Sequence, residues 1–125
     1  MFHQNMNFFY PQSTKFNSLT LKENEWRSLA DMLPTFRHTM TDVIEGHRKP
    51  IEVPDYSLSN NVMVSIEKYV PAGGNRSHIL FSVTDRSGPF PWMRVSLSKD
   101  EFFSLCLKMK LAEDIIRVNK KIVNL

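Results

Sequence analysis

The chain of 125 residues has few of the residues on which several classes of protein depend. Its one cysteine, Cys106, excludes an internal disulfide and a cysteine-ligated zinc cluster. No apolar run approaches the ~18 residues that a transmembrane helix needs. The first residues, from Met1 to Asn7, lack the charged start and apolar stretch of a signal peptide. We therefore expect an intracellular protein, nuclear or cytoplasmic and not secreted, without a membrane span.

Patterns that carry catalysis or metal binding are also scarce. The four histidines show no ligand spacing such as His-Glu-x-x-His. The segment from Gly73 to Arg76 lacks the Gly-Lys-Ser/Thr that completes a phosphate-binding loop. No pair of carboxylates stands out, and Cys106 falls on the flank of a predicted apolar stripe, where thiols are usually inert. We expect no enzymatic activity, no cofactor and no metal site.

The composition is that of an ordinary soluble domain, with 42% hydrophobic and 23% charged residues. Seven prolines and four glycines are too few for a fibrous or disordered chain. The net charge is uneven, because residues 1–60 carry −1 and residues 61–125 carry +4. A basic second half permits a polyanionic partner without requiring one. The length predicts a single domain over residues 1–125.

A first unit of strands and a helix is predicted over residues 7–46. An aromatic run at 7–10 is stopped by Pro11, and residues 16–21 alternate with Leu19 and Leu21 on one face.

A helix is expected from Glu23, and Gly46 is its expected end. Pro34 predicts a kink and not a break, since the apolar stripe continues in register beyond it. The stripe has spacings of three and four residues and consists of Trp26, Leu29, Leu33, Phe36, Met40 and Val43.

A second unit is predicted over residues 61–121, after a connecting loop at 47–60 that has room for a short strand. Three strands cover residues 62–70, 77–85 and 92–97, with turns between them. The inward residues are Val62, Val64, Ile66, Ile79, Phe81, Val83, Met93, Val95 and Leu97. The outward residues are Met63, Ser65, Glu67, Tyr69, His78, Leu80, Ser82, Thr84, Trp92, Arg94 and Ser96.

The last helix begins with a capping box from Ser98 to Glu101. Its apolar stripe consists of Phe102, Leu105, Met109, Ala112 and Ile116. Both stripes read as core, and the two helices can pack together within one chain or across a homodimer. The fold class is therefore α+β: a curved antiparallel sheet backed by two amphipathic helices, in the order β-β-α-β-β-β-α.

Two segments resemble each other at an offset of 76 residues. Residues 19–29 and 95–105 have Leu, Glu, Ser and Leu in common, and Trp26 corresponds to Phe102 as the first residue of the stripe. Both run from an alternating strand into a helix. We interpret them as an internal strand–helix repeat, in which Lys22 is a poorer cap than Ser98.

This pattern, Leu-polar-x-x-Glu-aromatic-x-x-Leu, resembles the last strand and helix of the transcriptional coactivators called positive cofactor four. Those proteins belong to a superfamily of single-stranded nucleic-acid-binding regulators that includes the Whirly and Pur-alpha proteins. Residues 18–34 look like the coactivator branch, whereas residues 64–67 and 72–79 look like a Pur-type hairpin. The resemblance covers residues 16–44 and 61–117.

The chain departs from the coactivators just before its last strand. There the family has a stretch rich in Lys, Arg and Gly, and this chain has the aromatic and proline-rich segment from Gly88 to Trp92. The first unit also has room for at most two strands before its helix, where the family has four. The resemblance implies binding of single-stranded DNA or RNA with weak sequence preference, in transcription or replication.

Candidate binding residues lie on the predicted outward face. Aromatic rings there can stack on unpaired bases, and arginines in the strands and turns can neutralise phosphates. The predicted set is Tyr69, Arg76, His78, Arg86, Trp92 and Arg94. The basic stretch 117–121 is most simply a solvated helix end, and otherwise extends such a track.

The rival interpretation covers the same face with another subunit or with the N-terminal segment. A related alternative is a structural or adaptor protein that docks a protein partner through Phe90, Trp92 and Tyr69. Glu67 on this face favours the rival. The sequence does not choose between DNA and RNA.

Overall fold

The computed structural model describes residues 5–7 and 18–123, with side chains described over residues 19–115. Its elements, in chain order, are β1 Asn5–Asn7, β2 Ser18–Thr20, α1 Glu23–Ile44, the 3-10 helix η1 Pro50–Glu52, β3 Tyr56–Ser57, β4 Val62–Tyr69, β5 His78–Asp85, β6 Met93–Leu97 and α2 Lys99–Val123.

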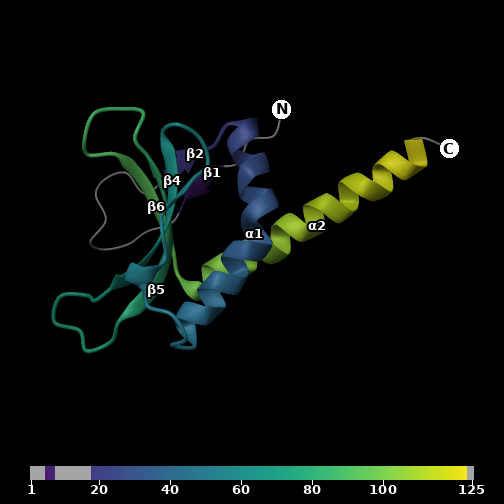
Figure 1. Ribbon diagram of the computed structural model, residues 1–125. Helices are drawn as coiled ribbons and strands as arrows, with labels where there is room; N and C mark the ends of the chain where they lie inside the picture. The colour runs from purple at the N-terminus through teal and green to yellow at the C-terminus, as the bar shows by residue number, and fades with distance from the viewer. Residues whose placement is uncertain (1–4, 8–17, 124–125) are drawn as a thin grey trace.

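The main sheet is antiparallel, with the strand order β3-β4-β5-β6. Both helices lie on one side of it (Figure 1). The strands β1 and β2 pair separately, and β2 lies against β6. The α+β class and the order of the elements are confirmed. The short strand for which the loop at 47–60 had room is β3, which pairs Tyr56 with Val64 and Ser57 with Met63. The addition in this loop is the 3-10 helix η1.

The core lies between the sheet and the helices. Phe81, on the inward face of the central strand β5, is fully buried. Its ring centroid lies 5.5 Å from that of Phe36 in α1 and 4.5 Å from that of Phe102 in α2. Every predicted stripe residue of α1 is buried, as are Phe102, Leu105 and Met109 of α2. The two helices also contact each other within one chain.

The predicted limits of α1 agree with its structure. The helix continues through Pro34 without a break, and its axis bends along its length (Figure 1). It ends in a Schellman motif, in which the His47 amide donates to the Asp42 carbonyl over 2.9 Å and the Gly46 amide donates to the Val43 carbonyl over 3.1 Å. Gly46 has a φ of 80°, which explains the glycine at this position.

The strand–helix repeat is visible at the start of both helices. In α1 the Lys22 amide donates to Glu25 Oε1 over 2.8 Å, and in α2 the Ser98 amide donates to Glu101 Oε1 over 3.0 Å. The better cap of the second unit is confirmed, because Ser98 Oγ accepts from the Glu101 amide over 3.3 Å whereas Lys22 makes no side-chain cap bond. Glu25 is 5% exposed and its Oε2 accepts from Ser59 Oγ over 2.6 Å, which ties α1 to the segment before β4.

Two sequence predictions need correction. Met93 was expected inward, but it is 47% exposed because it begins β6 at the end of the sheet. Leu80, Ser82 and Thr84 lie on the outer face as expected, yet they are 6%, 0% and 9% exposed. Their strand lies between β4 and β6, so neighbouring side chains surround them.

Some predictions concern residues outside the described set. Most of the predicted strand at 7–10 lies outside the described residues, because β1 covers Asn5–Asn7 and residues 8–17 are not described. The same holds for the side chains of Ile116 and of the basic stretch 117–121, although the α2 backbone is described to Val123.

A matched test compares the carboxylates at the first turns of the two helices, Glu25 in α1 and Glu101 in α2. Glu25→Ala removes a buried acceptor with two partners, and hydrogen bonds to charged groups contribute ~1.5–3 kcal/mol each, so we expect a loss of about 3–6 kcal/mol. Glu101→Ala, at the exposed equivalent, is expected to lose about 0.5–1 kcal/mol. Urea unfolding of both variants measures the difference, and equal losses would contradict the role assigned to Glu25.

Candidate functional site

The strand register divides the predicted binding residues into two groups. On the outer face Tyr69 pairs with His78 at one end of β5, and Thr84 pairs with Arg94 near the other end. Six residues of extended strand separate His78 from Thr84, which is roughly 20 Å. The predicted residues therefore share one face but do not form one cluster.

The first group lies at the β4–β5 hairpin. The Tyr69 and His78 rings have centroids 6.4 Å apart and an interplanar angle of 34°. His78 and Arg76 are exposed, and Tyr69 is half-buried. The Tyr69 hydroxyl is buried and has no hydrogen-bond partner among the described residues. The open groups at this end are thus the His78 ring and the Arg76 guanidinium.

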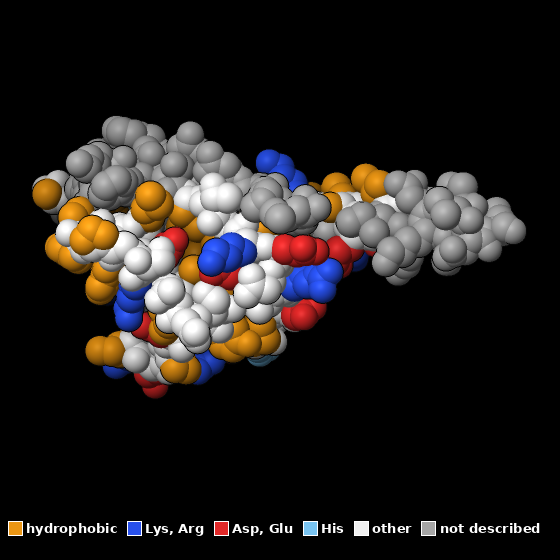
Figure 2. All heavy atoms as spheres, turned by 90° about the horizontal axis from the view of Figure 1, so that it is seen from above, with side chains coloured by type: hydrophobic (Ala, Val, Ile, Leu, Met, Phe, Trp, Pro, Cys, Tyr) orange, Lys and Arg blue, Asp and Glu red, His pale blue; other side chains and the backbone are white. Residues whose placement is uncertain are grey.

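The second group lies at the β5–β6 turn. The Arg86 guanidinium lies over the Trp92 ring, 4.8 Å from its centroid. Phe90 meets the same indole edge-on, with the centroids 5.5 Å apart and an angle of 84°. Phe90 is 79% exposed. Hydrophobic side chains gather at this end of the molecule in Figure 2. The three side chains form a surface of one cation and two rings, which we call the Arg86–Trp92–Phe90 cluster.

Arg94 is held within the sheet. It forms an ion pair with Glu67 Oε2 and also donates to Ser82 Oγ over 3.3 Å. The other carboxylate oxygen, Glu67 Oε1, accepts from Ser65 Oγ over 3.1 Å. Burial lowers the pKa of the Arg94 guanidinium, and the charge of Asp55 acts in the opposite direction. A phosphate would have to compete with Glu67 for this cation.

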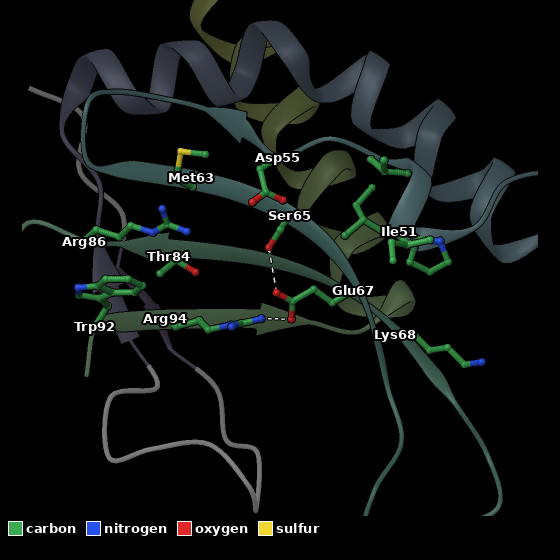
Figure 3. A pocket seen from close by; sticks show the side chains of 13 residues that line it. Ile51, Asp55, Met63, Ser65, Glu67, Lys68, Thr84, Arg86, Trp92 and Arg94 are labelled. Carbon is green, nitrogen blue, oxygen red and sulfur yellow. Dashed lines mark hydrogen bonds and ion pairs between the residues drawn. The ribbon is translucent and has the colours of Figure 1, made fainter. Parts of the chain in front are cut away.

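A hollow of about 480 Å³ lies between the outer face around Glu67, Arg94 and Trp92 and the segment before β3. Figure 3 shows Glu67 and Arg94 on its floor, with Asp55 above them and Trp92 and Arg86 at one end. Its walls carry both signs of charge. Sequence reasoning missed Asp55 and its neighbour Ile51, which is 91% exposed, since no local pattern shows that this segment folds back beside β4.

The centre of the outer face is closed to solvent. Leu80 and Ser82 are buried, and the Ser82 and Ser96 hydroxyls form a hydrogen bond of 2.9 Å. Bases therefore cannot stack on the middle of β5. The groups open to a ligand are the hollow and the two ends of the face.

Other chemistry finds little support within the described residues. No group of three or more His, Cys, Asp or Glu side chains there is arranged to hold a metal ion. Burial raises the pKa of the Cys106 thiol, with Arg37 acting in the opposite direction. None of the helices searched combines the length and apolar character needed to cross a membrane.

Comparisons with family models, with curated proteins and with solved structures find no match to this chain. The resemblance to positive cofactor four stays a prediction from the residues quoted above.

A double-mutant cycle of Arg94→Ala and Glu67→Ala tests whether the ion pair is open to water. The side chains are 41% and 37% exposed, so we expect a coupling free energy of about 0.2–1 kcal/mol. The more exposed pair Arg27–Glu23 on α1 serves as the control, with about 0.3–0.5 kcal/mol expected. A coupling above ~2 kcal/mol at Arg94–Glu67 would mean that this face is covered in solution.

Proposed function

We propose that this chain is a non-enzymatic protein that binds single-stranded DNA or RNA on the outer face of its sheet, with weak sequence preference. The Arg86–Trp92–Phe90 cluster carries the proposal. A positive charge beside one exposed and one half-buried ring matches a flexible strand, in which a phosphate accompanies every unpaired base.

The energetics of each contact favour this ligand. Stacking of an unpaired base on an aromatic side chain contributes ~1–3 kcal/mol, and it tolerates any base because every base has a π face. Phe90, which is 79% exposed, offers the more accessible ring, and Arg86 is exposed beside it. Neutralised phosphates release counterions, so binding must weaken as salt rises.

The second group of residues supports a path along the face. Arg76 and His78 offer a cation and a ring at the far end, roughly 20 Å away by strand length. A short single strand can span this distance over the hollow. We assign phosphate contacts to Arg86 and Arg76. Arg94 is paired with Glu67 and contributes to the floor of the hollow.

One observation favours the adaptor function as a second candidate. Ile51 and Phe90, at 91% and 79% exposure, are the most exposed large apolar side chains described, and both lie near the hollow. Aromatic and aliphatic anchors of this kind dominate protein–protein interfaces. Binding of a protein partner would respond little to ionic strength.

Fluorescence anisotropy of a labelled single strand of about 20 nucleotides, titrated at low and moderate salt with a duplex control, separates the two functions. The proposal predicts salt-sensitive binding to the single strand in preference to the duplex. No binding to any oligonucleotide at low salt would reject it and favour the adaptor.

The cluster itself is tested by substitution. Trp92→Ala removes the ring on which Arg86 lies and is expected to weaken binding ~5- to 150-fold, whereas Trp92→Phe keeps a stacking surface and loses less. Arg86→Ala should reduce the salt slope of log K by about one. Arg27→Ala, an exposed arginine on α1, is the matched control and should bind like the unaltered chain.

Anisotropy titrations at several salt concentrations measure these effects, and thermal unfolding checks that each variant is folded. Equal affinity of Trp92→Ala and the unaltered chain would exclude the cluster as the binding surface.

A further inference from the structure

The hollow on the outer face contains one carboxylate that the protein itself does not use. Asp55 and Glu67 are the two acidic residues that line it. Both oxygens of Glu67 are engaged, because Oε2 pairs with Arg94 and Oε1 accepts from Ser65. Asp55 is exposed and has no hydrogen bond or ion pair within the described part of the chain. An ionised carboxylate only accepts hydrogen bonds, so Asp55 fits a ligand that offers donor groups.

The cations around Asp55 narrow the class of ligand. Arg86 lies at one end of the hollow and Lys68 at the other (Figure 3), and both are exposed. These two residues repel a basic peptide, and Asp55 repels an acidic one. A nucleotide carries both kinds of group that the hollow complements, an anionic phosphate and a base whose edge donates hydrogen bonds.

The size and the walls of the hollow suit a base. Its volume of about 480 Å³ lies within the ~300–1,000 Å³ of ligand pockets, which combine apolar walls with a few polar groups. The apolar side chains are Ile51 and Val53 before β3, Met63 in β4 and Trp92 just before β6. An unpaired base packs its faces against such side chains and presents its edge to the polar groups.

We propose that the hollow holds one unpaired base of the bound strand and that Asp55 accepts hydrogen bonds from its edge, which selects guanine at this position. Guanine presents N1–H and the N2 amino group side by side, so it donates to both oxygens of one carboxylate. Adenine and cytosine each offer a single amino group. Thymine and uracil place N3–H between two carbonyl oxygens, which a carboxylate repels.

This inference rests on the proposed binding of a single strand and adds to it the recognition of one base. The other bases of the strand are not selected, so the sequence preference of the whole site stays weak. Asp55 lies in the segment 47–60, outside the residues that resemble positive cofactor four. The assignment of Asp55 therefore comes from this structure and not from the resemblance.

Strands of about twelve nucleotides that alternate thymine with a second base test the preference. The second base is guanine, inosine, which lacks the N2 amino group, or thymine itself. One bidentate pair discriminates ~5- to 150-fold, and half of the binding registers place the second base in the hollow. In fluorescence anisotropy the guanine strand should therefore bind at least ~3-fold more tightly than the thymine strand, with the inosine strand between them.

Substitutions of Asp55 separate its hydrogen bonds from its charge. Asp55→Ala removes the acceptor, so the guanine strand should lose its advantage, while the thymine strand binds at least as tightly as before because a negative charge is gone. Asp55→Asn complements an N–H beside a carbonyl, which guanine, inosine and thymine all present, so the three strands should bind equally. Asp31→Ala removes an exposed carboxylate from α1 and is the matched control, which should keep the full preference.

Equal binding of the guanine and thymine strands to the unaltered chain would overturn this inference and leave the proposed function intact. A guanine advantage that survives Asp55→Ala would overturn the role of Asp55 in the same way. Absence of binding to every strand would overturn both proposals. Thermal unfolding checks that each variant is folded.

Discussion

Phe81 contacts aromatic rings from both helices, Phe36 of α1 and Phe102 of α2, and is itself inaccessible to solvent. It lies at the centre of the sheet, because β5 is flanked by β4 and β6. A buried aromatic cluster of this kind contributes both apolar burial and specific ring geometry. It holds α1 and α2 on the same side of the sheet, and this arrangement decides which surfaces stay available for function.

The outer face is consequently built from polar groups that satisfy one another. Glu67 accepts from Ser65 and pairs with Arg94, while Ser82 bonds to Ser96 and also accepts from Arg94. This network forms the floor of the hollow, so the groups left without such partners lie at the two ends of the face. The Arg86–Trp92–Phe90 cluster lies beyond the network, in a turn, where side chains have room to meet a ligand.

The sequence predicts the helices well, since the spacing of Trp26, Leu29 and the residues after them is a direct consequence of helix geometry. It also predicts the face of each outer side chain, since alternation is intrinsic to a strand. Alternation does not predict how exposed an outer side chain is. Leu80 is buried because its strand is central, and strand order is a property of the whole sheet. The Arg94–Glu67 pair joins residues 27 apart and depends on register.

The exposed apolar residues of α2 show a different limit. One apolar stripe was enough to explain that helix from its sequence, so Leu107, Leu111 and Ile115 attracted no interpretation. Their exposure follows from where the body of the protein ends, which the structure shows and a periodicity does not.

The central claim is that ligand binds the outer face of the sheet and not the helical side. Amide chemical-shift perturbation of the full chain, titrated with a single-stranded oligonucleotide, tests it most directly. The account predicts shifts at Arg86, Phe90 and Trp92, extending to Arg76 and His78, with α1 unaffected. Shifts confined to the helices, or none at saturating oligonucleotide, would contradict it.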